Sequence, residues 1–180
     1  MASFGGIQGG SGMNIAFHDD IKPEFLYELM RKQRLLPDAY AKDPTLILNL
    51  VDRATTVSLS EGEELLGLVL GVKHTPEALN LMVFIINKSL PWADLAGVQE
   101  QLRERWFEGA ISRVQAIFPV SRKNTRKFLA HLGFIEETRG CGLRNTFNYG
   151  DHHEACTVMS LLPSDPIKTF HVERSVAHAS

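Results

Sequence analysis

Apolar residues in the first half of the chain follow spacings that predict four strands and two helices. A short strand over 14–17 precedes a helix that is capped by Asp19 or Asp20 and runs to about Arg34. Its buried face is predicted to comprise Ile21, Phe25, Leu29 and Met30. Asp43 followed by Pro44 is typical of a second helix start. The runs 55–59, 65–72 and 79–86 are separated by short polar turns and predict an antiparallel meander.

The second half of the chain continues with alternating helices and strands. Ser89 is predicted to cap a third helix that Gly109 ends. This helix buries Leu95, Val98, Leu102 and Trp106 and carries Glu100, Arg103 and Glu104 on its outer face. A strand over 114–118, a helix over 124–132 stopped by Gly133, and a last strand over 157–161 follow. The order predicts an α/β class, with a central mixed sheet flanked by about four helices.

Composition narrows the partners and the compartment. The 180 residues are 44% hydrophobic, which suits a single core. A formal charge of −2 gives no global field for nucleic acid or an anionic membrane, so neither is expected as a partner. The most apolar run is far too short to span a bilayer as a helix. Two cysteines and no secretory pattern favour two free thiols in a reducing, cytoplasmic compartment.

Three regions are expected along the chain. Residues 1–12 hold five glycines and are interpreted as a flexible N-terminal arm or an expression leader. An arm would offer a contact for a homodimer or an assembly partner. Residues 13–163 form the single domain, and residues 164–180 form a peripheral C-terminal tail.

One polar cluster and one cysteine are candidate chemical sites. Asp151, His152, His153 and Glu154 offer donors suited to zinc, but adjacent histidines on a strand point to opposite faces. A polar hairpin loop is the favoured interpretation, and no metal is expected. Cys141 stands between two glycines without a neighbouring base, which is typical of an ordinary free thiol.

The segment 118–140, FPVSRKNTRKFLAHLGFIEETRG, resembles the GNAT N-acetyltransferases. Asn124, Gly133 and Phe134 match that family's asparagine near a helix start and the Gly-Phe pair at the helix end. The resemblance implies a GNAT fold, acetyl-CoA as co-substrate and an amine acceptor on a small molecule or a protein. It also implies that cofactor contacts come from the end of one strand, the loop after it and the helix start, namely Val83, Phe84, Ile85, Ile86, Lys88, Ser89, Arg122, Lys123, Asn124 and Arg126.

The sequence departs from the family pattern at two places. The loop NKSLPWADLAG, 87–97, lacks the glycines that let a backbone approach pyrophosphate. Leu129 stands where many members carry a tyrosine that protonates the leaving thiolate. No general base is identified, and the candidates are His131, His74 and Glu64, with Glu63 as its neighbour.

Two functions therefore remain open at this point. The first is an acyl-CoA-dependent N-acyltransferase. The second is a degenerate GNAT-fold protein without catalysis, acting as a binding or structural component, for example in a viral or phage assembly. Compact GNAT-like chains encoded by phages fit this size and divergence, in which case the protein resides in the virion or host cytoplasm.

Overall fold

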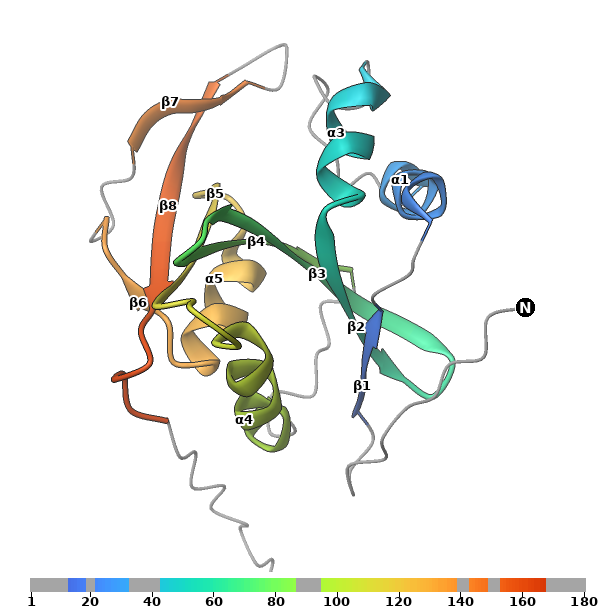
Figure 1. Ribbon diagram of the computed structural model, residues 1–180. Coiled ribbons are helices and arrows are strands. Elements are labelled where there is room, and N and C mark those ends of the chain that lie inside the picture. The colour runs from blue at the N-terminus through green and yellow to red at the C-terminus, as the bar shows by residue number, and fades with distance from the viewer. Residues whose placement is uncertain are drawn as a thin grey trace, which may run out of the picture.

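Four helices and eight strands are found in the part of the chain that the computed structural model describes, residues 13–18, 22–32, 43–86, 95–138, 143–148 and 153–167 (Figure 1). The strands are β1 (Met13–His18), β2 (Ala54–Glu61), β3 (Glu64–Thr75), β4 (Ala78–Ile85), β5 (Arg113–Pro119), β6 (Ile135–Glu136), β7 (Leu143–Asn148) and β8 (His153–Leu161). The helices are α1 (Pro23–Lys32), α3 (Pro44–Val51), α4 (Leu95–Trp106) and α5 (Lys123–His131). No described helix is long and apolar enough to cross a membrane.

All eight strands join one mixed sheet in the order β1-β2-β3-β4-β5-β8-β6, with β7 also on β8. Strands β2 to β4 form the predicted antiparallel meander, and β1 pairs antiparallel with β2 at its edge. Strand β5 then lies parallel to β4, because α4 carries the chain back across the sheet before β5 begins. Strand β8 pairs antiparallel with β5, so the sheet has two antiparallel halves joined by one parallel contact.

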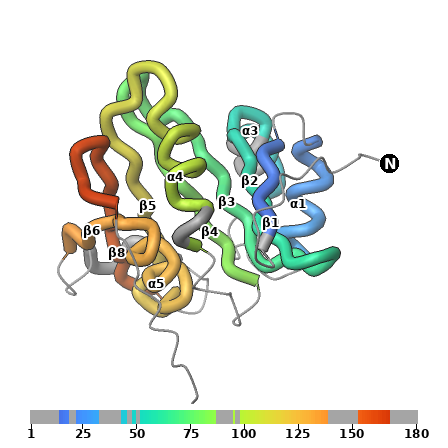
Figure 2. The backbone as a smooth tube through the Cα atoms, turned by 90° about the horizontal axis from the view of Figure 1, so that it is seen from below, coloured from blue at the N-terminus to red at the C-terminus, as the bar shows by residue number. Residues whose placement is uncertain are grey.

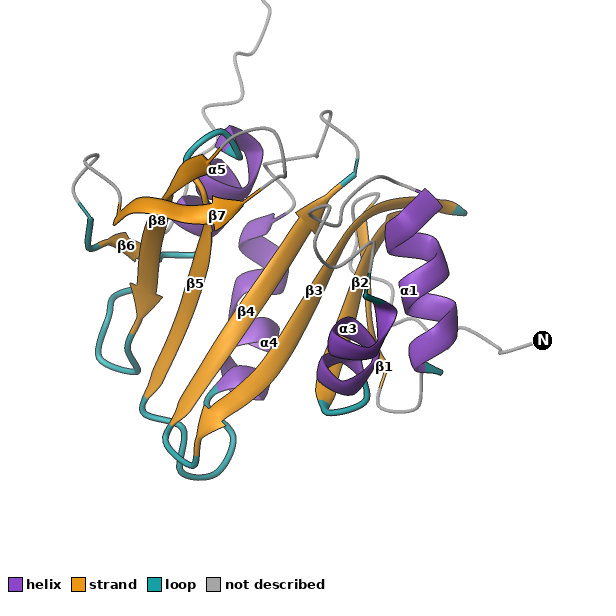
Figure 3. Ribbon diagram, turned by 90° about the horizontal axis from the view of Figure 1, so that it is seen from above, coloured by secondary structure: helices purple, strands orange, loops and turns teal. Residues whose placement is uncertain are grey.

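Helices cover both faces of the sheet, as the views from above and below show (Figures 2 and 3). Helices α4 and α5 lie on one face, over the main core, which includes Trp106, Phe128 and Phe134. Helices α1 and α3 lie on the other face, where Leu26 and Met30 of α1 pack against Leu68 and Leu70 of β3. The predicted α/β class with a mixed sheet is confirmed.

The predicted buried face of the first helix is partly wrong. Met30 is fully buried, but Phe25 is 60% exposed and Leu26 is buried instead. Leu26 and Met30 are four residues apart, so they share one helix face, and Phe25 is rotated away from it. Ile21 lies outside the described residues. The second helix starts as predicted, since Asp43 Oδ1 accepts a hydrogen bond from the Thr45 N–H at 3.1 Å.

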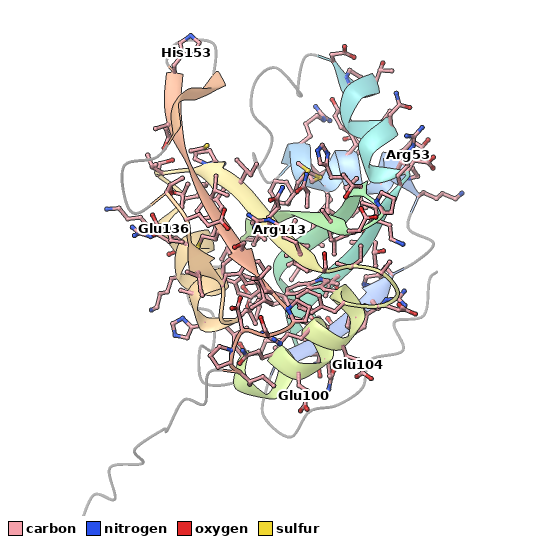
Figure 4. All side chains as sticks on the ribbon, turned by 60° about the vertical axis from the view of Figure 1, so that its left-hand side comes forward. Arg53, Glu100, Glu104, Arg113, Glu136 and His153 are labelled. Atoms are coloured by element: carbon pink, nitrogen blue, oxygen red, sulfur yellow. The ribbon has the colours of Figure 1, made fainter. Side chains whose placement is uncertain are left out.

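The third helix buries all four of its predicted apolar residues, but one of the three charged residues predicted for its outer face is buried as well. Glu100 and Glu104 point away from the sheet (Figure 4), whereas Arg103 is only 9% exposed. Its Nη2 donates to the backbone oxygens of Leu162, Pro163 and Asp165 at 2.9–3.3 Å. Arg103 therefore holds the chain that leaves β8 against α4, a contact that periodicity does not predict.

The turn after α5 has the backbone that the Gly-Phe pair predicts. Gly133 has φ +90°, where only glycine is unstrained. Phe134 is buried beneath α5, and its ring meets Trp106 edge-on with centroids 5.9 Å apart. This turn fixes the end of α5 to the core and returns the chain to β6.

Candidate functional site

The parallel contact between β4 and β5 is short, and the strands separate beyond it. Pairing covers Ala78–Leu81 of β4 and Arg113–Ala116 of β5. Past these residues β4 stays paired with β3 as far as Ile85, and β5 stays paired with β8 as far as Pro119. Figure 3 shows the two strands close together at their starts and apart at their ends. We call the separated stretches, 82–85 of β4 and 117–119 of β5, the open seam.

Backbone groups of β4 are directed into the open seam at alternate residues. The Ile86 N–H donates to Leu66 O of β3 at 2.9 Å, so Ile86 directs its polar backbone atoms toward β3. The direction in which the backbone N–H and C=O groups point alternates from one residue to the next along a strand. Phe84 therefore also faces β3, whereas the N–H and C=O of Val83 and Ile85 face the side that β5 has left. Their side chains pack toward the core under α4 and α5. Of the four predicted contacts, two therefore direct their backbone polar atoms into the seam and two direct them toward β3.

The start of α5 lies at the same end of the sheet, because it follows the end of β5 by three residues. Arg122 precedes the helix and Lys123 is its first residue. Arg126 is already engaged, since its guanidinium forms an ion pair with Glu136 of β6 at 2.5 Å. Of the predicted cations, Arg122 and Lys123 stand closest to the end of β5 in the chain.

Asn124, the residue that matches the family's asparagine near a helix start, does not cap this helix. The N-cap position is Arg122, without a side-chain hydrogen bond to the helix, and Asn124 lies inside the first turn. The helix starts early because the chain turns tightly after β5. Arg122 N–H donates to Pro119 O at 2.9 Å and Lys123 N–H donates to Ser121 O at 2.8 Å.

A carboxylate occupies part of this turn. Glu154 of β8 accepts a hydrogen bond from the Ser121 N–H at 2.5 Å. An amide directed outward near a helix start is a position at which an anion is favoured. Any phosphate that used this N–H would have to displace Glu154. The sequence indicated only a polar loop at 151–154; within β8, His153 is exposed and Glu154 is half-buried.

The closed end of the seam carries a chain of polar contacts. Gln115 of β5 donates from Nε2 to Asn80 Oδ1 of β4 at 2.6 Å and accepts from Arg113 Nε at 2.9 Å. Arg113 binds both carboxylate oxygens of Glu137 at 2.7–2.8 Å, and Ser160 Oγ donates to Glu137 at 2.7 Å. These donors hold the pKa of the Glu137 carboxyl below its usual range, Arg113 having the largest effect. Arg113 lies over the middle of the sheet (Figure 4).

The three candidate bases are not brought together. His74 is exposed near the β3–β4 hairpin, at the closed end of the seam. Glu64 is exposed at the start of β3, two strands from β5 in the sheet. His131 ends α5, and its Nδ1 lies 2.8 Å from Lys127 O.

Several predicted positions lie outside the described residues, namely Lys88, Ser89, Cys141, His152 and Asp151. Among the described residues no group of His, Cys, Asp or Glu side chains could hold a metal ion. Cys156 is a free, buried thiol. The sequence did not single out Asn80 or Gln115, and it gave Glu154 only a place in a polar loop. The signal for the first two is that each is a polar residue within a largely apolar strand.

Comparison with known proteins gives matches in structure only. No protein-family model and no curated protein sequence matches the chain. A spermidine N-acetyltransferase from Vibrio cholerae, solved with CoA and spermine, superposes with a TM-score of 0.58 at 11% identity, covering 86% of this chain and 97% of that one. A probable acetyltransferase gives 0.59 at 17% identity, covering 88% and 97%. The chain has the GNAT acyltransferase fold.

A third solved structure has a similar fold. The ribosomal L7/L12 α-N-protein acetyltransferase RimL, solved with coenzyme A, gives a TM-score of 0.58 at 12% identity and covers 87% of this chain and 97% of that one. The GNAT fold expected from the Gly133-Phe134 turn is therefore confirmed over most of the chain. The open seam lies in the middle of that fold, between β4 and β5.

Proposed function

We propose that the protein is an acyl-CoA-dependent N-acyltransferase that transfers an acetyl group from acetyl-CoA to an amine. The observation that carries the proposal is the separation of β4 from β5 after Leu81 and Ala116. An extended ligand with alternating amide groups can pair with a strand whose polar backbone atoms are not matched by a neighbouring strand. The pantetheine arm is such a ligand, and Val83 and Ile85 supply the matching groups.

The start of α5 supports the position of the phosphates. Lys123 is exposed and Arg122 half-buried beside the end of β5. Two cations beside a helix start provide charge and N–H donors suited to a phosphate-rich cofactor. With pantetheine along β4, these residues would bind the charged portion of CoA.

The reaction requires placement more than a special catalytic group. A neutral amine nitrogen attacks the thioester carbonyl, the C–S bond breaks, and the CoA sulfur leaves as a thiolate that takes up the proton released by the amine. Leu129 is fully buried and has no hydroxyl, so it supplies no proton to the thiolate. We infer that water in the seam carries the proton, and that the acceptor is an amine of a small molecule or a protein.

Cysteine usage supports a cytoplasmic site of action.

Cofactor binding is the first experiment. A ligand that binds only the folded state raises stability, by about 2.7 kcal/mol at a concentration of 100 times Kd. Titration with acetyl-CoA is expected to raise the Tm, and thiol release with an amine panel then identifies the acceptor. No shift at millimolar acetyl-CoA would reject the proposal. Lys123→Glu is expected to weaken binding about tenfold, whereas Lys73→Glu, an equal charge change near the closed end, is expected to leave it unchanged.

A second candidate function is a GNAT-fold binding or structural component without catalysis, as in a viral or phage assembly. The Glu154 carboxylate on the Ser121 N–H favours it, because that carboxylate occupies an amide that a phosphate would use. Under this alternative acetyl-CoA does not bind either the wild type or Glu154→Gln. Binding that improves in Glu154→Gln would reject it.

A further inference from the structure

The parallel contact between β4 and β5 consists of four residue pairs, and it decides where the seam opens. Parallel pairing is slightly less stable per residue than antiparallel pairing, and here it is the one β-ladder that joins the two halves of the described sheet. A strand pair that is already separated at one end can separate further, one pair at a time. The pairs that end at Leu81 and Ala116 therefore need a further stabilising contact to stay closed.

The face of these pairs that turns toward α4 is apolar. Leu79, Leu81, Val114 and Ala116 all belong to the main core. Their packing opposes separation of the strands, but it does not determine which residue pair is the last one. The energy of apolar packing changes gradually as the strands shift, whereas a hydrogen bond weakens steeply when its distance or angle changes.

The opposite face carries the directional contacts. Asn80 and Gln115 are register partners, one pair before the last, and their side chains meet at 2.6 Å. Both are half-buried, so the bond is partly shielded from competing water. At the start of the contact, Glu77 O accepts from the N–H groups of Ser112 and Arg113 at 2.9 and 3.2 Å.

Gln115 is held in turn from the far half of the sheet. Arg113 Nε donates to Gln115 Oε1, which leaves Gln115 Nε2 directed at Asn80. Glu137 fixes the guanidinium through both carboxylate oxygens, and Ser160 of β8 donates to the same carboxylate. The contacts therefore run without interruption from β4 across β5 to β8.

We propose that Asn80 and Gln115, held by Arg113, Glu137 and Ser160, form a clamp that fixes the opening of the seam at Leu81 and thereby positions Val83 and Ile85. These are positioning residues. Their effect on cofactor binding rests on the proposed function, whereas their effect on the strand contact does not. If the clamp is lost, the pair Leu81–Ala116 opens more often and the spacing presented to the ligand is no longer constant.

Residue-resolved amide exchange tests the clamp in the absence of cofactor. The Leu81 N–H faces β5, while the Met82 and Phe84 N–H groups face β3, by the alternation fixed at Ile86. In Asn80→Leu, which matches the size but removes the acceptor, Leu81 is expected to exchange about fivefold faster, the effect of one net hydrogen bond. Met82 and Phe84 are expected to keep their wild-type rates.

Two controls separate the clamp from a general loss of stability. Asn80→Asp retains an oxygen acceptor for Gln115 and is expected to exchange as the wild type does. Ser58→Ala removes another cross-strand side-chain contact, to His18 at 2.8 Å, at the far edge of the sheet. It is expected to leave Leu81 unchanged. Gln115→Met provides a second clamp variant if Asn80→Leu does not fold.

The outcomes are distinct. Unchanged Leu81 exchange, or an equal rise at Leu81 and Met82, overturns the clamp. Faster Leu81 exchange with an unchanged CoA dissociation constant overturns the positioning role, since the affinity is expected to fall by about the same fivefold factor. If the wild type binds no CoA, the proposed function fails, and the exchange measurement still decides whether the clamp exists.

Discussion

Gly133→Ala is predicted to destabilise the protein through both its backbone and its neighbours. At φ +90° an L-residue costs about 1–2 kcal/mol relative to glycine. A Cβ atom there would lie 3.2 Å from Gln99 Nε2, which donates to Leu132 O at 3.1 Å in a buried site. Displacing that amide adds roughly 1 kcal/mol for the weakened hydrogen bond. The total is about 2–3 kcal/mol, or a fall in Tm of roughly 4–12 °C for a chain of this size.

The matched control is Gly62→Ala. Gly62 also has a positive φ, +57°, but a Cβ atom there would meet nothing within 4 Å. Its cost is therefore the backbone penalty alone, about 1 kcal/mol. Urea unfolding of the three proteins gives the difference between the two variants. If Gly133→Ala is no more destabilising than Gly62→Ala, the contact with Gln99 does not constrain the turn.

Three further predictions concern the core, the clamp and the start of α5. Phe134→Ala is expected to cost about 3–5 kcal/mol in urea unfolding, because it removes a buried ring packed edge-on against Trp106. Glu137→Gln is expected to cost roughly 0.5–1 kcal/mol at pH 7, since the pair with Arg113 is partly exposed and screened. The pKa of Glu137 is lowered in the folded state, so its stabilising effect is complete above the unfolded pKa of about 4.3 and is lost as pH falls through the lower, folded pKa. Glu154→Gln is expected to tighten CoA binding a few-fold in calorimetry, because the competing carboxylate loses its charge.

Each of these predictions has a contradicting result. A cost below about 1 kcal/mol for Phe134→Ala would mean that the core closes around the missing ring. A stability difference between the wild type and Glu137→Gln that stays constant to pH 2 would exclude a depressed carboxyl pKa as its cause. Weaker CoA binding in Glu154→Gln would show that this carboxylate supports the site instead of competing for it.

Much of the fold follows from the sequence because each strand and helix carries its own period. The three strands of the meander and the apolar face of α4 were predictable, since burial on one face imposes spacing on the residues themselves. The predicted burial of Phe25 and the predicted exposure of Arg103 were wrong for the same reason. A helix has residues at the margin of its buried face, and neighbouring elements decide which of them are covered.

The cofactor contacts at Val83–Ile86 were expected from the family resemblance and not from any local pattern. Val83 and Ile85 differ from Phe84 and Ile86 in backbone direction, which depends on the register with β3. Asn80 and Gln115 are 35 positions apart and meet because β4 and β5 are in register at that pair. Side-chain contacts across a parallel crossover have no signature at a fixed sequence spacing. Polar residues within largely apolar strands are the available hint.

The open seam between β4 and β5 is proposed to bind acetyl-CoA through the backbone of β4. Amide chemical shifts measured during a titration with acetyl-CoA test it most directly. Large shifts and slower exchange are expected at Val83 and Ile85, whose N–H groups face the seam, and small changes at Phe84, whose N–H faces β3. Saturable binding with no change at Val83 or Ile85, or no binding at millimolar acetyl-CoA, would contradict it.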